Sequence, residues 1–123
     1  MSARVGVEIP RFLRLVHALP EVGHTESARY TAFAVHGAKF GYLWPRTATV
    51  GLKQTLSEQR ALVAERPQVF EVQFTAGGFG WVVVHLAGID LDELGELVLE
   101  AWRLSAPERL LAGMPTPAQV VEA

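Results

Sequence analysis

Three short segments rich in β-branched and aromatic residues follow one another with very little chain between them. They span residues 30–35, 38–44 and 47–53. His36-Gly37 joins the first two, and the glycine can take the positive φ that a tight hairpin turn requires. Strands joined by two-residue loops run antiparallel, because a parallel connection needs a dozen or more residues. The middle of the chain therefore predicts an antiparallel sheet.

Amphipathic segments predict helices around these strands. Apolar residues recur at helical spacing over residues 8–19, a capping box begins residues 55–66, and a second N-cap begins the longest helix at residues 90–104. Residues 69–74 and 81–86 predict a second hairpin. The order α-βββ-α-ββ-α favours an α+β fold: a two-layer sandwich with an antiparallel sheet of about five strands and helices packed on one face.

The length of the chain fits one domain. With 123 residues, half of them hydrophobic, it can bury an adequate core. We expect a single domain over residues 1–115 and a mobile tail over residues 116–123. The absence of cysteine excludes disulfides, thiolate nucleophiles and cysteine-based metal sites. No apolar run is long enough for a membrane span or a signal-peptide core, so a soluble cytoplasmic protein without membrane contact is expected.

The period of two along each strand predicts which side chains share a face of the sheet. If both loops of the three-stranded region have two residues, Val35 lies opposite Ala38 and Trp44 lies opposite Thr47. One face then collects small and aliphatic residues suited to docking helices, such as Ala32, Ala34, Leu43, Ala48, Val50 and Leu52. The other face collects aromatic, hydroxyl and basic residues: Thr31, Phe33, Phe40, Tyr42, Trp44, Thr49, Lys53, Trp81 and His85.

This second face is the main candidate for a functional surface. Unpaired bases stack on aromatic rings, at about 1–3 kcal/mol each, and nearby Lys or Arg side chains can meet phosphates. The candidate nucleic-acid-binding residues are Phe40, Tyr42, Trp44, Arg46, Lys53 and Trp81. The alternative is that these rings form a second core layer, covered by the C-terminal segment or by a partner subunit, as in a homodimer.

Charge gives no simple attraction for nucleic acid, because the formal net charge is −2. Five acids and no base lie in residues 90–100, however, so eleven bases face eight acids in the rest of the chain. A locally basic face is therefore compatible with the composition. Within the acidic segment, Asp92, Glu96 and Glu100 form a ridge at helical spacing, typical of a solvated helix face with at most a weakly bound divalent ion.

Other patterns that could carry chemistry give weaker indications. The glycine-rich residues 75–80 lack phosphate-loop spacing and precede a strand, which favours a hairpin tip. No serine lies in a nucleophile motif, so we expect no enzyme, no catalytic residue and no cofactor. The histidines show no metal-ligand spacing, although two that are distant in sequence could still meet, and a small-ligand pocket would need some of them. They are His17, His24, His36 and His85.

Five short motifs, taken together, resemble one family. They are Ala18-Leu19-Pro20-Glu21-Val22, the hairpin from Val35 to Leu43, Val50-Gly51-Leu52-Lys53, Gly80-Trp81-Val82-Val83-Val84 and Glu100-Ala101-Trp102-Arg103-Leu104. In this order and spacing they resemble the MmcQ/YjbR family of small bacterial proteins over about residues 9–112. The resemblance implies a CyaY-like (frataxin-like) α/β fold, also described as a double-wing arrangement, and DNA binding without catalytic residues.

Two positions depart from the family pattern. Members often carry Lys directly after the hairpin glycine, where this chain has Ala38, with Lys39 following on the other face. Members also often have a small-aromatic pair such as Ser-Tyr where this chain has Ala101-Trp102. The first departure removes a positive charge from the predicted platform. The expected partners are DNA or single-stranded nucleic acid, or a second copy of the chain.

Overall fold

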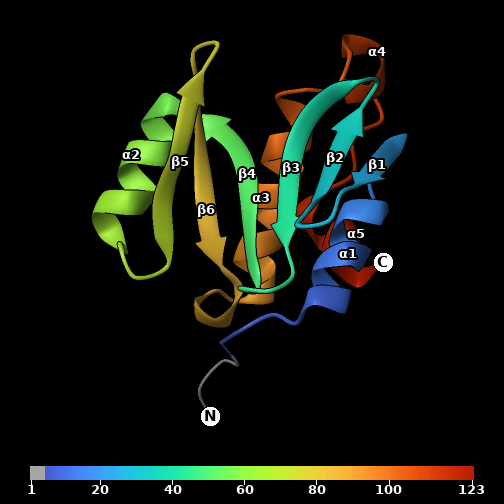
Figure 1. Ribbon diagram of the computed structural model, residues 1–123. Helices are drawn as coiled ribbons and strands as arrows, with labels where there is room; N and C mark the ends of the chain where they lie inside the picture. Colours follow the sequence, from blue (N-terminus) through green and yellow to red (C-terminus); the bar gives the residue numbers. More distant parts are fainter. Residues whose placement is uncertain (1–4) are drawn as a thin grey trace.

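The sheet has six antiparallel strands in the order β1-β2-β3-β4-β6-β5 (Figure 1), within the residues 5–123 that the computed structural model describes. The strands are β1 (Val22–Glu26), β2 (Thr31–Val35), β3 (Ala38–Trp44), β4 (Thr49–Thr55), β5 (Phe70–Ala76) and β6 (Phe79–His85). The helices are α1 (Ile9–His17), α2 (Leu56–Glu65), α3 (Leu91–Arg103), α4 (Glu108–Leu111) and α5 (Pro117–Glu122), with a 3-10 turn η1 (Leu86–Gly88).

The long helices pack on one face of the sheet (Figure 1). α3 lies across β4 and β3, and α2 lies across β6 and β5. On α1, the ring of Phe12 meets that of Phe33 edge-on, with 5.9 Å between the centroids. Gly80 lets α2 approach β6 closely, since a Cβ atom there would lie 2.6 Å from the Cβ atom of Gln59. The predicted α+β sandwich is confirmed, with six strands rather than about five.

Both predicted hairpins end in tight turns with left-handed backbone. His36 and Gly37 have φ angles of 49° and 78°, and Gly77 and Gly78 have φ angles of 59° and 82°. Two consecutive positive φ angles are typical of the type I′ turn, whose twist matches that of the flanking strands. Val35 lies opposite Ala38, as predicted.

The turn between β3 and β4 is longer than predicted. Trp44 lies opposite Thr49 instead of Thr47, because residues 45–48 form a four-residue turn in which Ala48 has a φ of 52°. A shift of two residues keeps every side chain on its predicted face. The predicted faces of β3 and β4 are therefore correct. Leu43, Val50 and Leu52 lie on the helix side, and Tyr42, Trp44 and Lys53 lie on the opposite side. Only Ala48 leaves its predicted face, because it lies in the turn.

A β-bulge at Phe40 inverts the predicted face of β2. The register with β3 shifts between Phe33 and Ala34, which pair with Gly41 and Lys39 and leave Phe40 as the extra residue. A one-residue shift exchanges the two faces of a strand. Phe33 and Phe40 are consequently fully buried in the core, against the prediction that both lie on the aromatic face. Thr31 follows Phe33 to the helix side.

The same bulge brings other side chains to the helix-free face. Ala32 pairs with Tyr42, and Ala34 pairs with Lys39, so these four residues share that face. Lys39, expected on the helix side, is therefore exposed on the opposite side. Ala32 and Ala34 likewise leave the helix-docking face to which the simple alternation assigned them.

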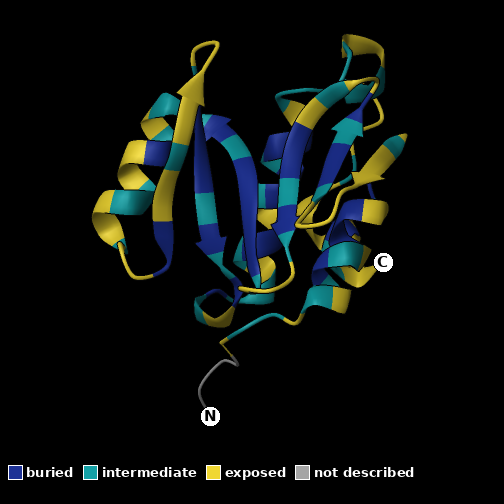
Figure 2. Cartoon of the chain, in the orientation of Figure 1, coloured by how far each residue is buried: buried dark blue, intermediate teal, exposed yellow. Residues whose placement is uncertain are grey.

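Two elements have no counterpart in the sequence-based prediction. β1 is an edge strand whose residues are mostly exposed (Figure 2), so it shows no alternation of apolar and polar residues. The segment from Thr116, predicted as a mobile tail, forms α5, with a capping box between Thr116 and Gln119. Val120 is buried there, and α5 packs against α3.

Candidate nucleic-acid interface

A chain of aromatic side chains crosses the helix-free face from β2 to β5. We call it the aromatic row; its members are Tyr30, Tyr42, Trp44, Trp81 and Phe74. Ring centroids are 5.7 Å apart for Tyr30 and Tyr42, 5.6 Å for Tyr42 and Trp81, and 5.2 Å for Trp81 and Phe74. Trp44 stacks beside Tyr42 at 5.8 Å with 19° between the planes. The row therefore forms one continuous contact surface.

Gly51 on β4 makes room for this surface. It pairs with Tyr42 on one side and with Val83 on the other, at the centre of the sheet. A Cβ atom at this position would lie 2.3 Å from Oε1 of Gln73 and 3.0 Å from Cη2 of Trp44. The side chains of Gln73 and Trp44 thus lie directly over the glycine backbone, and rings from β3 and β6 meet across β4.

The exposed ring surface lies mainly at the ends of the row. Tyr30 is 37% exposed and Phe74 is 39% exposed, whereas Trp81 is 6% exposed. Tyr42 and Trp44 are half-buried. Trp81 consequently lies beneath the other rings. A ligand would contact chiefly Tyr30 and Phe74, together with the exposed parts of Tyr42 and Trp44.

Gln59 of α2 holds the two strands that carry Phe74 and Trp81. Its buried Nε2 donates hydrogen bonds to the carbonyl oxygens of Trp81, at 2.8 Å, and of Phe74, at 3.1 Å. The second carbonyl lies beside a bulge in β5, where the register shifts between Val72 and Phe74. The Gln59 amide therefore supplies hydrogen bonds to backbone carbonyl groups where the bulge interrupts the regular pairing of β5 and β6. Sequence reasoning missed this role, for which a polar residue on a buried helix face was the only signal.

The cationic side chains near this surface differ in their exposure and in the contacts that they already make. Arg46 is exposed in the turn after Trp44 and has no ion pair among the described residues, and Lys39 is exposed on the helix-free face. Lys53 is half-buried: its Nζ donates to Oγ of Ser105 at 3.0 Å and lies 4.1 Å from the ring centroid of Phe79. Burial lowers the pKa of Lys53. Ser105 follows the C-terminal end of α3, whose carbonyl groups favour a cation.

One carboxylate shares the face with these groups. Glu71 of β5 contacts Nε2 of His85 on β6. Thr49, directly opposite His85, shares a 2.7 Å hydrogen bond with the hydroxyl group of Thr47. These polar groups lie at the end of the face near the β3–β4 turn, where Trp44 pairs with Thr49.

The structure thus brings together Tyr42, Trp44 and Trp81 from the predicted set, with Arg46 and Lys53 at its margins. Phe40 is excluded, because it is buried in the core. Tyr30 and Phe74 were missed. The signal that could have found Tyr30 is its alternation with Ala32 and Ala34 once β2 is inverted, whereas Phe74 reaches this face through a bulge that its sequence does not reveal.

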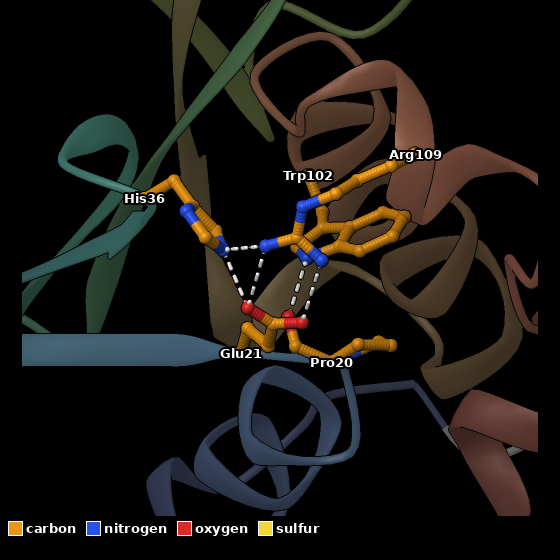
Figure 3. A network of polar contacts seen from close by, with 5 residues as sticks. All are labelled: Pro20, Glu21, His36, Trp102 and Arg109. Atoms are coloured by element: carbon orange, nitrogen blue, oxygen red, sulfur yellow. Dashed lines mark hydrogen bonds and ion pairs between the residues drawn. The ribbon is translucent and has the colours of Figure 1, made fainter.

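A second group of polar side chains lies where β1, the β2–β3 turn and α4 meet (Figure 3). Glu21 contacts Nε2 of His36 at 2.5 Å and Nη2 of Arg109 at 3.2 Å. Nearby, Nε1 of Trp102 donates to the carbonyl oxygen of Pro20 at 3.0 Å. Hydrogen bonds from Arg109 and His36 hold the pKa of the Glu21 carboxyl below its usual value. The side chains of Glu21, His36 and Arg109 are all exposed, so the group links three segments of the chain at the surface.

The acidic ridge and the histidines were the other candidates for binding. Glu100 bonds to Arg103 on the same helix, at 2.7 and 2.8 Å, while Asp92 and Glu96 are exposed. Across residues 5–123, no group of three or more His, Asp or Glu side chains is placed to hold a metal ion. Nor does any helix in this part of the chain combine the length and apolar character that crossing a membrane requires.

Comparison with known proteins agrees with the fold. The YjbR family model matches residues 17–104. Over 51 residues the chain is 39% identical to uncharacterized proteins of Mycobacterium bovis and Mycobacterium tuberculosis, a match covering 42% of this chain and only 40% of each relative's length.

A solved structure is similar over more of the chain. The crystal structure of Deinococcus radiodurans protein DR2400, a DUF419 domain, superposes with a TM-score of 0.71 over 85% of this chain and 81% of that one. At 18% identity this likeness bears on the fold alone. The family model covers well over half of the residues and includes all five motifs in full, from Ala18 to Leu104. The chain therefore belongs to the YjbR family.

Proposed function

We propose that the protein is a non-enzymatic binding domain whose aromatic row takes single-stranded nucleic acid. The observation that carries this proposal is the unbroken chain of five aromatic rings on the sheet face opposite the long helices. Bases of any sequence stack on such rings, at about 1–3 kcal/mol per base. A platform of this kind fits recognition through base faces rather than through a base-specific code.

The geometry favours single strands over a duplex. Bases in a duplex are stacked on each other, and reading them in the major groove needs a projecting helix or ribbon. The row is part of a sheet face, with its exposed ring surface at Tyr30 and Phe74. Tyr42 and Trp44 are only 5.8 Å apart, less than the roughly 7 Å, or two stacking distances, that a base inserted between them would need. Bases would therefore lie on the outside of the row.

The distribution of charge supports the same surface. Lys39 is an exposed cation on the same sheet face as the row, and Arg46 is an exposed cation in the turn after Trp44, whereas Glu71 is paired with His85. We assign the phosphate contacts to Lys39 and Arg46, because Lys53 already donates to Ser105. Substituting either cation should make the slope of log K against log salt shallower by about 0.7, the value for one phosphate of a single strand.

The test is fluorescence anisotropy with a labelled oligothymidine at low and moderate salt. Tyr30→Ala and Phe74→Ala should each weaken binding about 5- to 150-fold, the equivalent of one stacked base. Val72→Ala is the matched control, because Val72 is 57% exposed on the same strand as Phe74 but pairs with Val82 on the helix side. Absence of binding at low salt, or equal affinity of all three variants, would contradict the proposal.

Self-association through the same face is the second candidate function. It is favoured by the small or uncharged residues that surround the row, which are Ala32, Ala34, Gly51 and Val83. A symmetric dimer would cover Tyr30 and Phe74 without burying many charges. Sedimentation velocity over a wide concentration range should then show a dimer that Phe74→Lys converts to a folded monomer. A wild-type monomer at the highest concentration would exclude this candidate.

A further inference from the structure

His17 and His24 lie next to each other, although the sequence separates them by a turn. His17 ends α1, and His24 is the middle residue of β1. Their ring centroids are 5.6 Å apart, with 74° between the planes. Phe33 lies beside both histidines, because it pairs with His24 across the strands and its ring centroid lies 6.2 Å from that of His17. Two independent contacts therefore place both imidazoles on the helix side of the sheet edge.

Both rings border a shallow pocket of about 350 Å³ between α1 and the first two strands. Its floor is apolar, with Leu13, Phe33 and Leu43 among its residues, and Glu26 is the one carboxylate in its lining. Both histidines are exposed, and neither ring takes part in a hydrogen bond within the described part of the chain. The two imidazoles thus have free nitrogen atoms at the rim of a hollow.

We propose that His17 and His24 together bind one divalent transition-metal ion of the copper, nickel or zinc class. Neutral imidazole is a preferred ligand of these ions, whereas magnesium and calcium prefer oxygen. With metal–nitrogen bonds of about 2.1 Å, two imidazoles on one ion have ring centroids roughly 5–6 Å apart. The observed separation falls in this range, so small rotations of the rings suffice.

The remaining coordination positions belong to water. No third His, Asp or Glu is placed to complete a cluster within residues 5–123, so the site is open and of modest affinity. Glu26 lies two residues from His24 on the same face of β1 and adds a negative charge near the ion without coordinating it. The site differs in place and in chemistry from the aromatic row on the opposite face.

A bound ion would cross-link the edge strand β1 to the helix α1. β1 pairs with β2 alone, and its residues are largely exposed. Ligands from α1 and β1 on one ion would oppose local opening of this edge, because an ion that binds only the closed form shifts the equilibrium toward it. Amide exchange in residues 22–26 should slow on metal addition, while exchange in β5 at the other edge should not change.

The test uses untagged, chelator-treated protein titrated with zinc chloride and with nickel chloride in a calorimeter. We expect one ion per chain and at least a tenfold loss of affinity in His17→Ala and in His24→Ala. His36→Ala and His85→Ala are matched controls, because each removes an exposed or half-exposed histidine that contacts a glutamate elsewhere. Both should bind like the wild type.

Circular dichroism of each variant controls for folding, and His17→Gln and His24→Gln serve if an alanine variant unfolds. The proposal is overturned if neither metal binds at millimolar concentration, or if either folded single variant retains the wild-type affinity.

Discussion

Gly51 shows how one missing side chain shapes the helix-free face. A Cβ atom at this position meets Gln73, which is flexible and can move aside, and the edge of the Trp44 ring, which is stacked on Tyr42. A larger residue must therefore displace Trp44. We predict that Gly51→Val destabilises the protein by about 1–3 kcal/mol, the usual cost of overpacking, and changes the near-UV circular dichroism of the stacked rings.

Gly23→Val is the control for this prediction. Gly23 also lies in a strand, but nothing lies within 4 Å of a Cβ atom built there. A valine at that position should be neutral or slightly stabilising in urea denaturation, because it only gains strand propensity. Equal effects of the two substitutions would show that Gly51 has no special packing role.

At the level of single elements, hydrophobic spacing and turn residues predicted the core of the fold. The apolar spacing of α1 and α3, the capping box that begins α2 and the two glycine-containing turns all lie close to where they were expected. These signals are local, because each depends on residues that are neighbours in the sequence. The α+β sandwich followed from their order, and so did the existence of a face without helices.

The face of β2 could not be predicted, because it depends on a pairing between strands. Phe33 and the two alanines beside it fit either face by composition, and only the bulge at Phe40 decides between them. Because of the bulge, Phe33 and Phe40 lie in the core, and Lys39 lies on the same face as the candidate interface. Within β3 and β4, where the register slipped by an even number, the assignments of Tyr42, Trp44 and Lys53 survived.

Two further elements went unpredicted for different reasons. β1 is an exposed edge strand with one glycine and no apolar alternation, so it resembles a loop in sequence. α5 does carry a signal, the Thr116 to Gln119 capping box with Pro117 at the first helical position. What the sequence did not reveal is the docking site on α3, where a Cβ atom at Gly95 would lie 2.6 Å from a methyl group of Val121.

Across the whole molecule, one exposed network joins segments from both halves of the chain. Glu21 precedes β1, His36 lies in the β2–β3 turn and Arg109 belongs to α4 (Figure 3). Glu21 and His36 both have positive φ angles, 57° and 49°, which non-glycine residues seldom adopt. The contacts of Arg109 with Glu21 therefore link α4 to backbone that is itself held in an uncommon conformation.

This network predicts a pH dependence of stability with a definite sign. Arg109 foremost, and then His36, lower the pKa of Glu21 in the folded protein, whereas an unfolded glutamate titrates near 4.3. Ionised Glu21 therefore favours the folded state above that value, and the contribution is lost as pH falls through the folded pKa. In Arg109→Ala, the pKa of Glu21, followed by carboxyl-carbon NMR, should rise toward its ordinary value. The difference in unfolding free energy between wild type and variant should be largest near neutral pH and shrink below about pH 4.

Arg60→Ala, which removes an exposed arginine without an ion pair among the described residues, should leave the Glu21 titration unchanged. A stability difference for Arg109→Ala that is as large at pH 3 as at pH 7 would show that Arg109 acts through packing and not through its charge.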